Sequence, residues 1–299
     1  MKSALQLDPN RLFPADPATR EIAAGLYELV ADLPIISPHG HVDPALLAEN
    51  KPFANPAELF LYYDHYVFRL LHASGHGLGF LKRGGTEQEA RAAWRLLCEN
   101  WHLLAGTSSG YWLNHEFATL FGIDEIPNAQ NADRLYDLIA QQLATPEFLP
   151  RALFDRFNIA VMATTDDPVD DLAAHRALAA DPTFSGRVTP TFRPDRYLDP
   201  RVLGWQQNVA ALLESAGISG ANYANFVEAL KIRRAYFIAN GAFSADHGVF
   251  EPYTADLSDS VAADLFDRAL AGTISAADAR ELAGHFLTLS AGMSAEDGL

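Results

Sequence analysis

Cysteine and long apolar runs are nearly absent from this sequence, and each absence excludes a class of protein. The single cysteine, Cys98, cannot form a disulfide within the chain, and this usage is typical of a reducing compartment. No apolar run approaches the roughly 20 residues that a membrane-crossing helix requires. The first residues also lack the sustained apolar stretch of a secretory signal. We therefore predict a cytoplasmic protein with no membrane partner.

Basic residues are scarce as well. The 22 Lys and Arg residues face 38 Asp and Glu residues, and the formal net charge is −16. Binding to nucleic acid requires clustered basic side chains that displace counterions from phosphates, so we predict no nucleic-acid partner. Small acidic substrates remain compatible with this charge, because one or two arginines in a pocket can bind a carboxylate. Hydrophobic residues make up 49% of the chain, which predicts a folded protein with a substantial core.

Short apolar runs alternate with helical segments, and this alternation predicts an α/β fold. Four runs are candidate strands, at residues 33–37, 158–163, 187–192 and 242–244. Polar residues follow each run, which is where (β/α)₈ barrels and other parallel α/β folds place their chemistry. Helix capping explains any one of these polar residues equally well. Their recurrence after four candidate strands favours a shared site.

The region between the first two candidate strands, residues 50–150, is helical and rich in aromatic residues. We predict that it is a helical insertion in a single barrel-type domain covering residues 1–299. A further helix is expected to begin with Pro168 as its first residue, and two more are expected at 260–269 and 275–289. A closed barrel needs eight strands, so four imply an incomplete, C-terminally truncated barrel with exposed strand edges.

The sequence His39-Gly40-His41 directly follows the first candidate strand. In an extended segment, residues two positions apart point the same way, so both imidazoles can face one metal ion. Neutral imidazole suits Zn²⁺ and similar divalent ions. Two histidines are too few for a complete site, and a structural pair is the commoner explanation of such a motif on its own. The position after the first strand, followed by Asp43, favours the metal.

A second group, Asp64-His65-Tyr66, lies within the aromatic insertion. Tyr66 can donate a proton or, as a phenolate, accept one. Adjacent helical positions do not share a face, so the three side chains cannot all enter one pocket. On spacing alone, an aromatic insertion that packs on itself explains these residues better.

Two further groups follow the last two candidate strands. Arg193 can hold a carboxylate with two parallel hydrogen bonds, and the alternative is a surface ion pair with Asp195 or Asp199. Asp246 and His247 can position a hydroxyl group, carry a proton or bind a metal. The alternative for Asp246 is that it caps a helix.

Five motifs together resemble the uronate isomerase family of the amidohydrolase superfamily. They occur in the family's order, as His-Gly-His at 39–41, Asp-His-Tyr at 64–66, Thr-Asp-Asp-Pro at 165–168, Phe-Arg-Pro-Asp at 192–195 and Ala-Asp-His-Gly at 245–248. The first motif is common to the whole superfamily, and the other four are specific in combination. The resemblance runs from about residue 5 to the C-terminus.

The resemblance implies a distorted (β/α)₈ TIM-type barrel with a helical insertion after the first strand. It also implies interconversion of D-glucuronate with D-fructuronate and of D-galacturonate with D-tagaturonate, and a divalent metal, usually Zn²⁺. The expected site residues are Tyr66, Asp246 and His247 as catalytic groups, Arg193, Asp64 and His65 as substrate-binding groups, and His39 and His41 as metal ligands. Members of the family continue past the last residue of this sequence, through a His and a late Asp that have no counterpart here, so the base at C2 is left open.

Alternatives to an isomerase remain at this point. One is a metal-dependent hydrolase of the same superfamily, acting on an amide, ester or lactone. Another is an inactive truncated fragment that binds a metal or a sugar acid. The oligomeric state is also open, and a homo-oligomer is compatible with the sequence.

Overall fold

The computed structural model describes Leu5 and residues 8–299, and it confirms the predicted α/β class. The chain forms two compact units. The first contains the described residues up to Pro34 together with Asn50–Asn158, and the second contains Ile35–Glu49 and Ile159–Leu299. Each unit has its own cluster of buried apolar side chains, which is the usual mark of a separately packed body.

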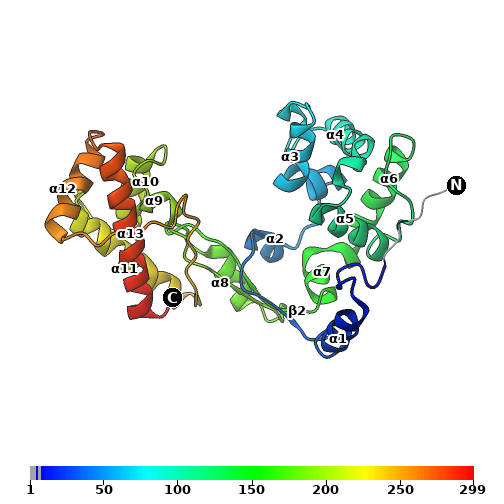
Figure 1. Ribbon diagram of the computed structural model, residues 1–299, viewed down its shortest axis with the longest axis horizontal. Helices are drawn as coiled ribbons and strands as arrows, with labels where there is room; N and C mark the ends of the chain where they lie inside the picture. Colours follow the sequence, from blue (N-terminus) through cyan, green and yellow to red (C-terminus); the bar gives the residue numbers. More distant parts are fainter. Residues whose placement is uncertain (1–4, 6–7) are drawn as a thin grey trace. The chain divides into compact units, whose positions relative to one another are not determined.

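The first unit is helical throughout its described part. Its elements are α1 (Pro17–Glu28), the π-helix η1 (Glu58–Tyr62), α3 (His65–Ala73), η2 (Leu78–Phe80), α4 (Glu87–Glu99), η3 (Trp101–Leu104), α5 (Ser108–Thr119), α6 (Ala132–Leu143), η4 (Pro146–Phe148) and α7 (Pro150–Arg156). Helix α4 begins with a reciprocal capping box between Thr86 and Glu89, which satisfies two exposed backbone N–H groups. Figure 1 shows α3, α4, α5 and α6 gathered into one helical cluster.

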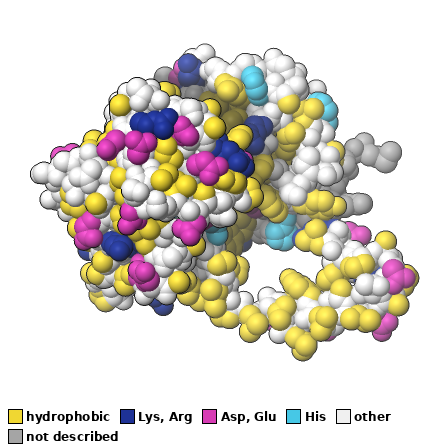
Figure 2. All heavy atoms as spheres, turned by 60° about the vertical axis from the view of Figure 1, so that its left-hand side comes forward, with side chains coloured by type: hydrophobic (Ala, Val, Ile, Leu, Met, Phe, Trp, Pro, Cys, Tyr) yellow, Lys and Arg dark blue, Asp and Glu magenta, His cyan; other side chains and the backbone are white. Residues whose placement is uncertain are grey.

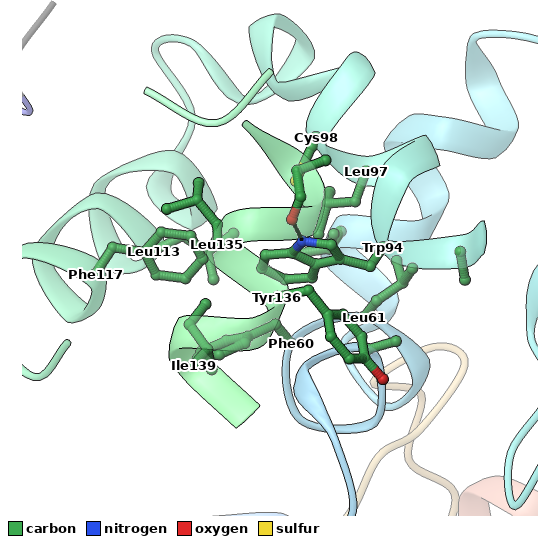
Figure 3. Close-up of a cluster of buried hydrophobic side chains, with 14 of the residues drawn as sticks. Phe60, Leu61, Trp94, Leu97, Cys98, Leu113, Phe117, Leu135, Tyr136 and Ile139 are labelled. Atoms are coloured by element: carbon green, nitrogen blue, oxygen red, sulfur yellow. Dashed lines mark hydrogen bonds between the residues drawn. The ribbon is translucent and has the colours of Figure 1, made fainter. Parts of the chain in front are cut away.

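Aromatic packing holds this helical unit together (Figure 3). Trp94 is fully buried, and its indole N–H donates to the carbonyl of Ala132 over 2.9 Å, so its polar atom is satisfied inside the core. Its ring stacks with Phe117 at a centroid distance of 6.1 Å and meets Tyr136 edge to face at 6.3 Å. The aromatic residues of the first unit thus form a core of their own.

The second unit is built on a parallel sheet with the order β1-β2-β3. Its strands are β1 (Ile35–Ser37), β2 (Ile159–Ala163) and β3 (Arg187–Thr189). Ser37 pairs with Met162, and Ala163 pairs with Thr189. The segments that follow the three strands therefore leave the sheet at the same edge, where parallel α/β folds bind ligands.

The predicted fourth strand at 242–244 is wrong as a strand. Only one parallel bridge forms there, between Phe192 and Ala245. The Phe192 N–H donates to the Ser244 carbonyl over 3.1 Å, and the Asp246 N–H donates to the Phe192 carbonyl over 3.0 Å. Extending this ladder toward the C-terminus needs an N–H from residue 194, which is a proline and has none.

The second unit also contains helices, which provide most of its buried core. They are α2 (Pro44–Glu49), α8 (Ala173–Ala180), α9 (Asp195–Leu198), α10 (Trp205–Ser215), α11 (Tyr223–Ala239), α12 (Asp259–Leu270) and α13 (Ala276–Asp297). Trp205 and Phe226 are buried and both contact the ring of Phe266, which lies on α12. Helices α10, α11, α12 and α13 are thereby packed into one cluster (Figure 1).

Two predicted helix boundaries are also wrong. The helix expected to begin at Pro168 begins at Ala173, because the side chains of Asp167, Asp170 and Asp171 each accept a hydrogen bond from the backbone N–H two residues later. Such local turns compete with helix formation. The last helix, expected to end near residue 289, continues to Asp297, where Gly298 terminates it with a φ of 82°.

The surface agrees with the acidic composition. On the face shown in Figure 2, acidic side chains are scattered and are not gathered into one block. None of the helices in the described part of the chain combines the length and the apolar character needed to cross a membrane.

Candidate active site

His39 and His41 lie just beyond β1, at the carboxyl edge of the sheet, with their Nε2 atoms 3.1 Å apart. The other ring nitrogen of each histidine contacts an oxygen. His39 Nδ1 lies 2.9 Å from Asp246 Oδ2, and His41 Nδ1 lies 3.1 Å from the hydroxyl of Thr165. Gly40 packs closely here, because a Cβ there would lie 3.1 Å from the carbonyl of Ala163. The Nδ1 atom of each ring thus contacts an oxygen, and the two Nε2 atoms face each other.

This geometry fits a pair of metal ligands. Two imidazole nitrogens bound to one tetrahedral Zn²⁺ are about 3.3 Å apart, given Zn–N bonds of about 2.0–2.1 Å. Metal-bound histidines also commonly donate their second N–H to a carboxylate or another oxygen. Within Leu5 and residues 8–299, no group of three or more His, Cys, Asp or Glu side chains is arranged to hold a metal. The two histidines thus have the spacing of a metal-ligand pair, without a third such ligand beside them in the described residues.

Arg193 and Asp246 join the same site. Arg193 Nη1 lies 3.5 Å from Asp246 Oδ2, and its Nε donates to Asp195 Oδ2 over 2.7 Å. Burial alone would lower the pKa of Arg193, but the carboxylates of Asp195 and Asp246 outweigh it and raise the pKa. Asp246 Oδ2 is buried, and it lies close to His39 and Arg193 without an aligned hydrogen bond to either. The ion pair with Asp195 that the sequence left as an alternative is present as well.

His247 follows Asp246 but faces a different space. Its ring lines a cavity of about 480 Å³ together with Thr254, Thr288 and Ser294. The Nε2 atom is buried and has no hydrogen-bond partner in the part of the chain that the structure describes. Burial lowers the pKa of His247, which favours the neutral ring. The structure does not place this side chain with the two histidines after β1.

Asp64, His65 and Tyr66 belong to the first unit. Asp64 is the N-cap of α3, and its Oδ1 accepts hydrogen bonds from the backbone N–H groups of Tyr66, over 2.9 Å, and Val67, over 3.2 Å. His65 and Tyr66 are exposed, and their ring centroids lie 4.2 Å apart. Capping of α3 therefore explains the position of Asp64, whereas the rings of His65 and Tyr66 are open to solvent.

A buried polar network beside the site was not predicted. Thr164 donates to Asp166 Oδ2 over 2.7 Å, so His175 Nε2, at 2.8 Å, must donate to the Thr164 hydroxyl oxygen. The same carboxylate oxygen accepts from the backbone N–H of Thr191 over 3.0 Å, just before Arg193. Burial lowers the pKa of His175, in keeping with a neutral ring. The only signal in the sequence was the Thr-Thr-Asp segment after the second strand, and nothing there pointed to His175.

A parallel sheet whose carboxyl edge gathers two histidines, an arginine and a carboxylate defines an α/β protein with a polar site at that edge. Comparison with known proteins narrows this class. The family model described as glucuronate isomerase matches residues 17–298, and the chain belongs to this family. The resemblance drawn from the five motifs is confirmed.

Individual relatives agree with this assignment. A uronate isomerase of Corynebacterium efficiens is 46% identical over 301 residues, covering 100% of this chain and 64% of the relative. One from Xanthomonas axonopodis pv. citri is 47% identical over 305 residues, covering 99% and 64%. A crystal structure of glucuronate isomerase from Caulobacter crescentus matches with a TM-score of 0.93 at 42% identity, covering 99% of this chain and 62% of that chain. The chain thus spans somewhat less than two thirds of the length of these relatives.

Proposed function

We propose that the protein is an aldose–ketose isomerase of sugar acids, converting D-glucuronate to D-fructuronate and D-galacturonate to D-tagaturonate. The observation that carries the proposal is the cluster of His39, Asp246 and Arg193, in which a fixed cation lies beside groups able to exchange protons. The names of the relatives support the same activity.

The reaction moves a proton from C2 to C1 through a cis-enediol, while a proton passes from the hydroxyl at C2 to the carbonyl oxygen at C1. It needs a base near C2, a proton donor at oxygen and a group that holds the C6 carboxylate. We assign the carboxylate to Arg193, and we propose Asp64 and His65 as further substrate-binding groups. Asp246 and Tyr66 exchange protons with the substrate. His247 belongs to the same segment as Asp246 but lines the separate cavity with Thr254, Thr288 and Ser294.

His39 and His41 would hold a divalent metal, of which Zn²⁺ suits imidazole best. Such an ion supplies polarisation of substrate oxygens when bound. Asp246 keeps the His39 ring oriented for that role, and Thr165 does the same for His41.

The fold and setting follow the family resemblance. We propose that the three-stranded sheet is part of a distorted (β/α)₈ barrel, that residues 1–299 contribute to one barrel-type domain and that residues 50–150 are its helical insertion. Glucuronate and galacturonate are then the partners, without nucleic acid or membrane. The single cysteine is in keeping with a cytoplasmic enzyme, which can assemble as a homo-oligomer.

A coupled assay tests the activity. The protein is incubated with each uronate, and a dehydrogenase reports the ketose product by oxidation of NADH. We expect turnover that Asp246→Asn removes and that Asp264→Asn, an exposed aspartate on α12, leaves intact. Hydrolysis of an ester or lactone panel without uronate turnover would instead support the metal-dependent hydrolase.

A further inference from the structure

One carboxylate holds both the arginine of the site and the segment that carries Asp246. Asp195 Oδ2 accepts from Arg193 Nε over 2.7 Å, while Asp195 Oδ1 accepts from the backbone N–H of Gly248 over 2.8 Å. Gly248 lies two residues after Asp246. The two oxygens of Asp195 therefore tie the segment after β3 to the segment after the isolated bridge at Ala245.

The backbone of Gly248 lies against both the Arg193 guanidinium and the Asp195 carboxylate. A Cβ built on Gly248 would meet Arg193 Nη2 closer than real Cβ contacts allow, and it would lie 2.7 Å from Asp195 Oδ2. Both atoms are at the ends of flexible side chains, so an added methyl group would displace them without breaking the backbone. No residue larger than glycine fits against the guanidinium in its present orientation.

Asp195 is held in place by buried residues of α9. Asp195 is the first residue of α9, where Tyr197 and Leu198 are buried. The Trp205 indole N–H donates to the carbonyl of Tyr197 over 2.8 Å, and the Tyr197 hydroxyl donates to Asp167 Oδ1 over 2.5 Å. Since the backbone of Asp195 cannot shift easily, its carboxylate is a fixed point for the arginine.

We propose that Asp195 and Gly248 are positioning residues that orient Arg193 toward Asp246 and so set its recognition of the substrate carboxylate. This inference rests on the proposed isomerase function for the identity of the substrate. Asp195 leaves Nη1 and Nη2 without a bond from its carboxylate, and Gly248 limits where they can point. A planar guanidinium binds a carboxylate through two parallel bonds only in one plane, so its orientation decides affinity.

A stabilising ion pair is the competing explanation. The side chains of Arg193 and Asp195 are 26% and 27% exposed, and pairs that water reaches contribute little to stability. Either explanation accounts for glycine at position 248, because a Cβ there would meet atoms of both Arg193 and Asp195. The two explanations differ in what Gly248→Ala changes: orientation and substrate affinity in one, folding stability in the other.

The kinetic test compares Gly248→Ala with Gly292→Ala, a matched control on α13 where a Cβ meets nothing within 4 Å. We expect Gly248→Ala to raise the KM for D-glucuronate about tenfold or more, with a much smaller change in kcat, because carboxylate binding is lost equally in ground and transition states. Asp195→Asn should change KM and kcat in the same way as Gly248→Ala. Melting temperatures of Gly248→Ala and wild type should agree.

A second readout does not depend on activity. The Nε–H resonance of Arg193, assigned by its loss in Arg193→Lys, should exchange slowly with solvent in wild type and in Gly292→Ala. It should exchange rapidly or shift in Gly248→Ala and Asp195→Asn. An unchanged Arg193 signal in Gly248→Ala overturns the inference whatever the activity, and so does an unchanged KM in an active enzyme. A protein inactive on uronates whose Arg193 signal responds as predicted refutes the isomerase proposal and leaves the positioning intact.

Discussion

Removal of the carboxylate of Asp297 should destabilise the second unit strongly. Arg234, on α11, has a side chain only 1% exposed, and Asp297 at the end of α13 is its carboxylate partner. Their Nε–Oδ2 and Nη2–Oδ1 distances are 2.6 and 2.7 Å, and Ser294 accepts a further bond from Nη2 over 3.1 Å. Asp297→Asn therefore leaves a buried cation without a counter-charge.

The magnitude follows from burial. Removing one partner of a fully buried pair costs about 3–5 kcal/mol, and because Asp297 is 27% exposed, water compensates part of the loss, so we expect about 2–4 kcal/mol. Arg234→Met should cost less, because it leaves the carboxylate near solvent and places an apolar side chain in the buried position. We therefore predict that Asp297→Asn lowers the free energy of unfolding more than Arg234→Met does.

Hydrogen exchange followed by mass spectrometry measures this effect locally. Amides of α11 and α13 in Asp297→Asn should exchange roughly 30- to 900-fold faster than in wild type if they open with the second unit. Peptides from α4 and α6, in the first unit, act as the internal control. Equal protection of α11 and α13 in both proteins, or a larger effect of Arg234→Met, would refute the reasoning.

The pH dependence of this pair has a definite sign. The hydrogen bonds from Arg234 lower the pKa of Asp297 below its usual value. Its stabilising contribution is therefore complete above the unfolded pKa of about 3.9 and is lost as the pH falls through the lower folded pKa. Asp297→Asn should remove this part of the acid sensitivity.

Three further predictions concern individual side chains. His39→Ala and His41→Ala should each lower bound Zn²⁺ measured by mass spectrometry, and unchanged stoichiometry in both would remove them from the metal site. Arg193→Met should raise the KM for uronates by about ten- to a hundredfold, and an equal loss for a neutral aldose would contradict its carboxylate role. Burial lowers the pKa of His285, whose Nδ1 accepts from the Leu257 N–H over 3.2 Å, so stability should fall as the pH drops below about 6.5. In His285→Gln, the melting temperature should depend less on pH between about pH 5 and 7, where histidine titrates.

Local sequence signals predicted the helices and strands best where packing and propensity agree. The run at 159–163 is apolar, and Asn158, with a φ of 52°, turns the chain into it after α7. The last helix was predicted to end near residue 289, which is too short. Met293 packs into the core and Asp297 pairs with Arg234, and these tertiary contacts carry the helix further.

The site shows the same division between local and distant information. The histidines at 39 and 41 were recognisable from spacing after a strand, and the structure places their Nε2 atoms together. The contact of His39 with Asp246 joins residues far apart in the sequence, and no spacing rule reveals it. His175 was invisible for the same reason, because its partner Thr164 lies on the segment after β2 and only the fold brings the two together.

We propose that this chain isomerises uronates at the carboxyl edge of its sheet. Carbon-13 NMR of D-glucuronate labelled at C1 tests it most directly, with wild type, Asp246→Asn and Asp264→Asn in parallel. We predict that wild type and Asp264→Asn transfer the label from the hemiacetal signal to the hydroxymethyl signal of the ketose, without added nicotinamide or ATP, and that Asp246→Asn does not. An unchanged hemiacetal signal with folded wild-type protein and added Zn²⁺ would contradict the account.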